Sequence, residues 1–110
     1  MAVPRVQILV CTNERGADAE RPSCAPRGGL EVYRRFKDAV RREGLRDEVI
    51  VTRTGCLRHC SFGVTVGVWP DNRWYGGVTP DDVEEILASS VAGDGRVVER
   101  LALPPDAPFE

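Results

Sequence analysis

The chain has 110 residues, 42% of them hydrophobic and 29% charged, with a formal net charge of −2. This length provides one domain with one core, and the charge argues against nucleic-acid binding, which requires a clustered basic surplus. The apolar runs are only strand-sized and the first residues lack the basic start of an export signal, so we expect no membrane association. We therefore expect a cytoplasmic protein whose thiols are reduced.

The first part of the chain predicts a strand, a long loop and a helix. The apolar run Val6–Val10 predicts a buried strand that ends at Cys11. The segment from 12 to 29 shows no periodicity, and loops of this length are usually functional or disordered. A helix is predicted over Leu30–Glu43 and ends at Gly44. Its apolar stripe consists of Leu30, Tyr33, Phe36 and Val40.

The second part predicts three more strands and a second helix. The strands are expected within Asp47–Arg53, Val64–Trp69 and Arg73–Gly76. The last two form a hairpin around a turn at 70–72. Thr79 and Pro80 suit the start of a helix, whose inner face is expected to contain Val83, Ile86, Leu87 and Val91. Residues 97–103 predict a further short strand, and about 104–110 a loose tail.

This order of elements predicts a single α/β (α+β) domain over residues 1–110, with a mixed sheet and two main helices. A thioredoxin-like arrangement fits it. Trp74 and Tyr75 are neighbours on one strand and point to opposite faces, so one of them is expected to be exposed or in an interface. The helix charges are expected to form the pairs Glu31–Arg35 and Asp38–Arg42 on solvated faces. The alternative is a docking patch for a redox partner.

Four cysteines follow the pattern C-x12-C-x31-C-x3-C, and each lies in or beside a predicted loop. Both pairs fall at or near strand ends, so one sheet is able to present both loops at the same end. Four thiolates from two loops can hold zinc or an iron–sulfur cluster. Buried structural cysteines and disulfides are the simpler interpretations. A redox dithiol would require C-x-x-C, one residue shorter than the close pair here.

The choice between zinc and an iron–sulfur cluster depends on spacing. Cys56 and Cys60 resemble one zinc knuckle, but Cys11 and Cys24 are too far apart to form another. A two-iron cluster is broader than one ion, and glycines flanking the cysteine loops allow close approach of backbone amides. His59 is the only histidine, which excludes Rieske and Cys2His2 zinc sites. The residues favour a cluster and leave a structural zinc module for protein interaction as the alternative.

The chain resembles the thioredoxin-like [2Fe-2S] ferredoxins over nearly its whole length. The stretches that carry the resemblance are Cys11 after the first strand, Ser23–Gly28, Thr54–Cys60, Trp69–Gly76, Val78–Val83 and Val98–Leu101. The resemblance implies a thioredoxin-like fold and one [2Fe-2S] cluster bound by Cys11, Cys24, Cys56 and Cys60. It also implies one-electron transfer to unidentified redox partner proteins, no enzymatic chemistry, and often a homodimer. Arg58 and His59 are then either solvent-facing spacers or groups that tune the cluster potential.

Overall fold

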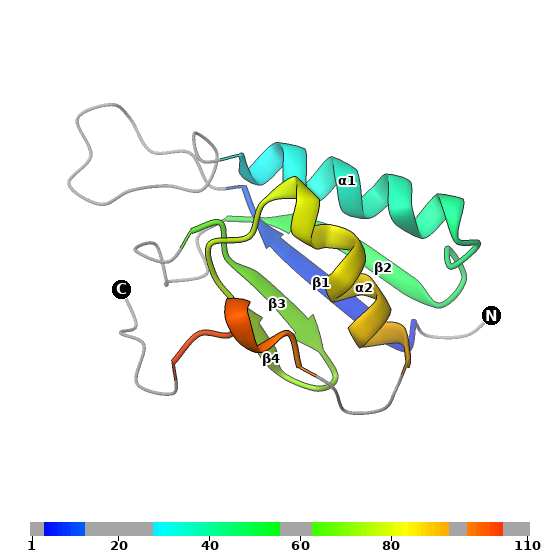
Figure 1. The fold of residues 1–110 in the computed structure, drawn as a ribbon. Helices are drawn as coiled ribbons and strands as arrows, with labels where there is room; N and C mark the ends of the chain where they lie inside the picture. Colours follow the sequence, from blue (N-terminus) through cyan, green and yellow to red (C-terminus); the bar gives the residue numbers. More distant parts are fainter. Residues whose placement is uncertain (1–3, 13–27, 56–62, 93–96, 105–110) are drawn as a thin grey trace.

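A mixed sheet of four strands forms the centre of the protein (Figure 1). The computed structural model describes residues 4–12, 28–55, 63–92 and 97–104. The strands are β1 (Val6–Cys11), β2 (Val49–Thr54), β3 (Val66–Trp69) and β4 (Arg73–Tyr75), in the spatial order β2-β1-β3-β4. β1 and β2 are parallel, whereas the pairs β1–β3 and β3–β4 are antiparallel. The predicted mixed sheet and its hairpin are confirmed.

Helix α1 (Gly29–Arg42) connects the parallel strands β1 and β2. It ends near the predicted position, where Gly44 has a φ of 69° and donates its amide to the Arg41 carbonyl. The buried side is shifted from the predicted stripe, because Leu30 and Tyr33 are only half-buried. Val32, Phe36, Ala39 and Val40 face the core instead. Their spacing also follows the helical repeat, so the sequence offered two overlapping stripes.

Helix α2 (Val83–Ala92) follows a 3-10 turn, η3 (Pro80–Asp82). The amide and the hydroxyl of Thr79 both donate to Oδ2 of Asp82, at 2.9 and 3.0 Å. The predicted helix start is therefore confirmed, with a carboxylate that fixes the entering chain. The predicted inner residues Val83, Ile86 and Leu87 are buried, while the side chain of Val91 lies outside the described residues.

Both helices cover the same face of the sheet (Figure 1). The core combines helix residues with the strand side chains of one parity, among them Ile8, Val10, Val66 and Val68. Strand side chains of the other parity point to the face without helices, where Ile50 is 46% exposed. Leu9, Trp69 and Trp74 on this face are half-buried. Trp74 and Tyr75, neighbours on β4, differ in burial as predicted, since Tyr75 is fully buried and Trp74 is half-buried.

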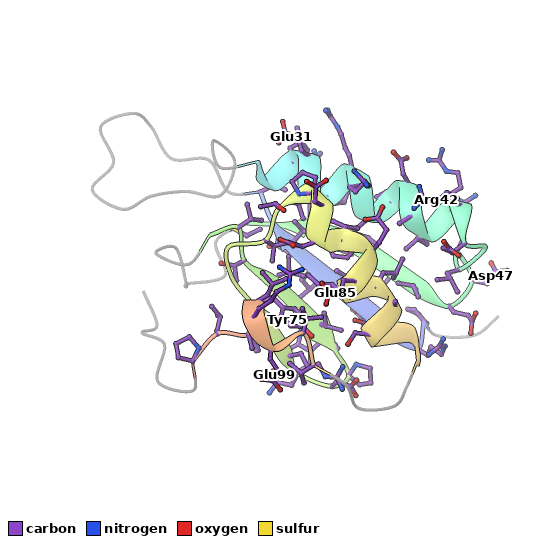
Figure 2. All side chains as sticks on the ribbon, in the orientation of Figure 1. Glu31, Arg42, Asp47, Tyr75, Glu85 and Glu99 are labelled. Atoms are coloured by element: carbon purple, nitrogen blue, oxygen red, sulfur yellow. The ribbon has the colours of Figure 1, made fainter. Side chains whose placement is uncertain are left out.

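The prediction of a strand over residues 97–103 is wrong. This segment contains the 3-10 turn η4 (Glu99–Leu101) and touches the sheet through a single bridge between Tyr75 and Ala102. The hydroxyl oxygen of Tyr75, a residue labelled in Figure 2, accepts a hydrogen bond from the Val98 amide nitrogen at 3.4 Å. β4 has only three residues, so it offers too short an edge for a further strand. The expected tail lies mostly at 105–110, outside the described residues.

Candidate functional site

Cys11 is the last residue of β1, and its side chain is only 2% exposed. Its amide donates to the carbonyl of Thr65, just before β3, at 3.1 Å. In the parallel ladder Cys11 is paired with Thr54, the last residue of β2. The sheet therefore fixes this cysteine between two neighbouring strand ends. Its position at the end of the first strand is as predicted.

Two threonines join the ends of β1 and β2. The amide and the hydroxyl of Thr12 both donate to the carbonyl oxygen of Thr54, at 3.0 and 3.2 Å. The hydroxyl of Thr54 donates to the carbonyl of Gly55 at 2.9 Å. Each threonine lies directly before a loop that contains predicted ligands. The two cysteine loops therefore leave the sheet side by side, as their places after strand ends predict.

The described chain resumes after each of the two loops at this same end of the sheet (Figure 1). The first returns at Gly28, which has a φ of 96° and caps the N-terminus of α1. The second returns at Gly63, two residues before the Thr65 carbonyl that holds Cys11. The N-terminus of a helix carries partial positive charge from its dipole. The end of the sheet thus combines a buried thiol, adjacent loop origins and a helix end that favours negative charge.

Of the residues predicted to bind a metal centre, the structure describes Cys11 alone. The other three predicted ligands, Cys24, Cys56 and Cys60, lie outside the described residues. So do Arg58 and His59. In the described ranges, no three Cys, His, Asp or Glu side chains form a metal-binding group. The ligand set remains a prediction from the sequence. The contact between Thr12 and Thr54 was not predicted from the sequence. The available signal was that Thr12 follows Cys11 directly and Thr54 precedes Cys56 by two residues.

The charged residues of α1 form ion pairs other than those expected. Arg35 and Arg42 both donate to Oε1 of Glu84 on α2, at 2.8 and 3.3 Å. Neither Glu31–Arg35 nor Asp38–Arg42 is an ion pair in the described part of the chain. The hydrogen bond from Arg35 lowers the pKa of Glu84 below its ordinary value, against a smaller opposing effect of burial. These side chains connect α1 to α2.

A second ion-pair group connects α2 to the C-terminal turn. Arg100 contacts Asp82 at 2.9 Å and also pairs with Glu85. Burial raises the pKa of Asp82, but the hydrogen bonds from Thr79 and Arg100 outweigh it, so the pKa lies below its ordinary value. The carboxylate thus remains ionised and holds both the start of α2 and the η4 turn. Its role is structural.

Comparison with known proteins gives close matches along nearly the whole chain, although no family model matches it. The chain is 39% identical over 103 residues to a 2Fe-2S ferredoxin of Clostridium pasteurianum, covering 94% of this chain and all of the relative. It is 38% identical to a 2Fe-2S ferredoxin of Aquifex aeolicus, covering 87% of this chain and 86% of the relative.

A solved structure supports the same assignment. The crystal structure of the wild-type thioredoxin-like [2Fe-2S] ferredoxin from Aquifex aeolicus matches with a TM-score of 0.84 and 36% identity. The match covers 93% of this chain and 99% of that chain. The predicted thioredoxin-like fold is confirmed, and among the described helices none has the length and apolar character needed to cross a membrane. The sequence relatives, the fold and the strand-end cysteine together show that the chain belongs to the family of thioredoxin-like [2Fe-2S] ferredoxins.

Proposed function

We propose that this protein is a one-electron carrier that binds a single [2Fe-2S] cluster through Cys11, Cys24, Cys56 and Cys60. The observation that carries the proposal is that the two strand ends from which the cysteine loops begin lie side by side, where Thr12 is hydrogen-bonded to Thr54. Cys56 follows Thr54 by two residues, so covalent geometry keeps it within about 7 Å of that strand end. The family names of the relatives support the same cofactor.

The residues present fit such a cluster. The four cysteine thiolates would hold the two irons, and the bound cluster would supply one-electron transfer without making or breaking a bond in a substrate. Cys11 is already buried and fixed by the sheet, which limits solvent access to the metal. The N-terminus of α1 at this end stabilises negative charge. We expect a low reduction potential, on the order of −400 mV, as in plant-type clusters.

The open face of the sheet supports a homodimer. Ile50 is 46% exposed there, and Leu9, Trp69 and Trp74 are half-buried. A hollow of about 590 Å³ beside Leu9 and Trp69 interrupts this face. Exposed apolar surface of this kind commonly marks an interface between proteins. Sedimentation of a Trp74→Ala variant tests the proposal, because a variant as dimeric as the parent, or a monomeric parent, would contradict it.

We further propose that the protein works in the cytoplasm, where thiols remain reduced, and serves redox partner proteins without being an enzyme. Electron carriers form weak, electrostatically steered encounters. The transfer rate should therefore depend strongly on salt. A rate that is flat between low and high ionic strength would exclude an electrostatic docking surface.

Metal analysis and spectroscopy test the cofactor. The purified protein should contain two irons and two acid-labile sulfides per chain, and a paramagnetic signal should appear on reduction. Replacing each of the four cysteines separately with alanine should abolish the signal, whereas a Thr52→Ala variant should keep it. Colourless protein with stoichiometric zinc would overturn the proposal. Retention of the native cluster in any of the four cysteine variants would overturn the ligand assignment.

A further inference from the structure

A cationic groove lies between α1 and β2. Three exposed cations, Lys37, Arg41 and Arg46, line a hollow of about 360 Å³. Its other walls are apolar and come from Val40 and the first half of β2, namely Val49, Ile50 and Val51. Within the described residues, no carboxylate forms an ion pair with any of the three cations. The groove therefore carries a positive charge that this part of the fold does not neutralise.

The opposite flank of α1 shows that this imbalance is local. On the side facing α2, Arg35 and Arg42 share the carboxylate of Glu84. Figure 2 shows Arg42 and Glu31 at opposite ends of the helix. The two flanks belong to one helix, yet the cations on the flank beside β2 form no ion pair with a carboxylate in the described structure. An acidic ligand from outside would complete it.

The groove adjoins a sheet edge, because β2 is an outer strand. In a parallel ladder, alternate residues direct their backbone groups to the same neighbour. The Thr54 carbonyl accepts the Thr12 amide, so Thr54, Thr52 and Ile50 face β1. Val51 and Arg53 then direct their amides and carbonyls outward. No hydrogen-bond partner for these outward groups exists among the described residues.

We propose that this edge binds an extended acidic segment of a partner protein, which adds to the sheet as a strand beside β2. Main-chain hydrogen bonds to an exposed edge provide affinity, and alternate side chains provide specificity. On the helix side, every second residue of the added strand would reach Lys37, Arg41 or Arg46. On the other side, the intervening residues would contact Ile50, which is 46% exposed. The geometry thus selects a segment that alternates acidic and apolar residues.

This surface is separate from the cysteine end of the sheet. The groove uses Val49 and Val51, whereas Cys11 is paired with Thr54 at the other end of β2. Thr54 follows Val49 by five positions, roughly 17 Å along a strand. The added strand would pair as far as Arg53, but none of its proposed contacts involves a cysteine. The proposal therefore does not rest on the cofactor and is tested by binding alone.

The probe is a labelled seven-residue peptide that alternates glutamate and valine, titrated into the purified full chain. We expect Arg41→Glu to weaken binding by about tenfold or more, since it reverses a charge in the groove. Arg34→Glu makes the same change on an exposed part of α1 outside the groove, and should alter binding less than about twofold. Arg46→Glu, outside the helix, provides a second groove variant in case Arg41→Glu unfolds.

Two further measurements separate strand addition from simple charge attraction. The peptide should slow amide exchange at Val51 and Arg53, and methylating its alternate amides on the edge that pairs should abolish binding. Failure of the peptide to bind, equal weakening by Arg34→Glu, or no protection of β2 would overturn the proposal. Equal binding of the methylated peptide, or its displacement by pyrophosphate at the same concentration, would instead indicate a general anion site and would also overturn it.

Discussion

The carbonyl oxygen of Thr54 accepts two hydrogen bonds from Thr12, one from the amide at 3.0 Å and one from the hydroxyl at 3.2 Å. Thr12 follows Cys11 directly, and Thr54 precedes Cys56 by two residues. A single acceptor thus fixes the starting points of both cysteine loops relative to each other. Preorganised ligands cost less entropy to order when they bind a metal centre, so this contact should support the site.

Thr12→Val should lower the free energy of unfolding by about 1 kcal/mol, because it removes one partly buried hydrogen bond and keeps the shape of the side chain. It should also accelerate loss of the cluster, measured by the decay of visible absorption. Thr12→Ser keeps the hydroxyl, so it should retain both the stability and the cluster lifetime of the parent. Thr52→Val is the matched control on an exposed position of β2. If the control and Thr12→Val lose the cluster equally fast, the threonine contact does not stabilise the site.

Tyr75→Phe should destabilise the C-terminal turn by about 1 kcal/mol, because the Val98 amide loses its acceptor inside the protein. The effect should be local. The Leu103 amide donates to the Trp74 carbonyl at 3.0 Å, and its hydrogen exchange should accelerate more than that of β1. Tyr33→Phe removes a hydroxyl from a half-buried position on α1 and should change neither rate. Equal acceleration throughout the sheet would indicate global rather than local destabilisation.

The sequence was sufficient for the elements whose information is local. Apolar runs located β1, β2 and β3, the turn at 70–72 located β4, and a proline after a capping threonine located the start of the second helix. The ion pairs could not be predicted in this way. Arg35 has an acid four residues before it, yet it pairs with Glu84, 49 residues further along the chain. Only the packing of α1 against α2 determines which acid lies closer.

The segment from 97 to 104 shows the same limit. Its apolar residues suit a strand, but β4 ends after three residues and the chain turns at Glu99–Leu101 to place Leu101 in the core. The candidate site was predictable to the extent that its cysteines follow strand ends. The Thr12–Thr54 contact was not, since it requires the parallel register of two strands far apart in the sequence.

Gly67→Ala should destabilise the protein by about 1 kcal/mol, because an added Cβ would lie 3.3 Å from the indole ring of Trp74. Trp74 is held by a hydrogen bond from its Nε1 to Asn72 and packs edge-on against Trp69. In a Trp74→Ala background the same substitution should cost much less. A double-mutant cycle measured by urea unfolding gives the coupling. Additive effects would show that the ring does not constrain Gly67.

Acid should weaken the connection between α1 and α2 through Glu84. Its pKa is below the ordinary value in the folded state because Arg35 donates to it. The folded protein therefore favours the ionised form, and this stabilisation is complete above the unfolded pKa, about 4.3. The stabilisation is lost as pH falls through the lower folded pKa.

Glu84→Gln should reduce stability slightly at pH 7, since exposed ion pairs contribute little, and the difference from the parent should vanish in acid. Glu99 is an exposed acid without an ion pair in the described structure. The stability difference between Glu99→Gln and the parent, measured by urea unfolding, should therefore not change between pH 7 and pH 3. A constant difference between the parent and Glu84→Gln across that range would contradict a role for the ionised carboxylate.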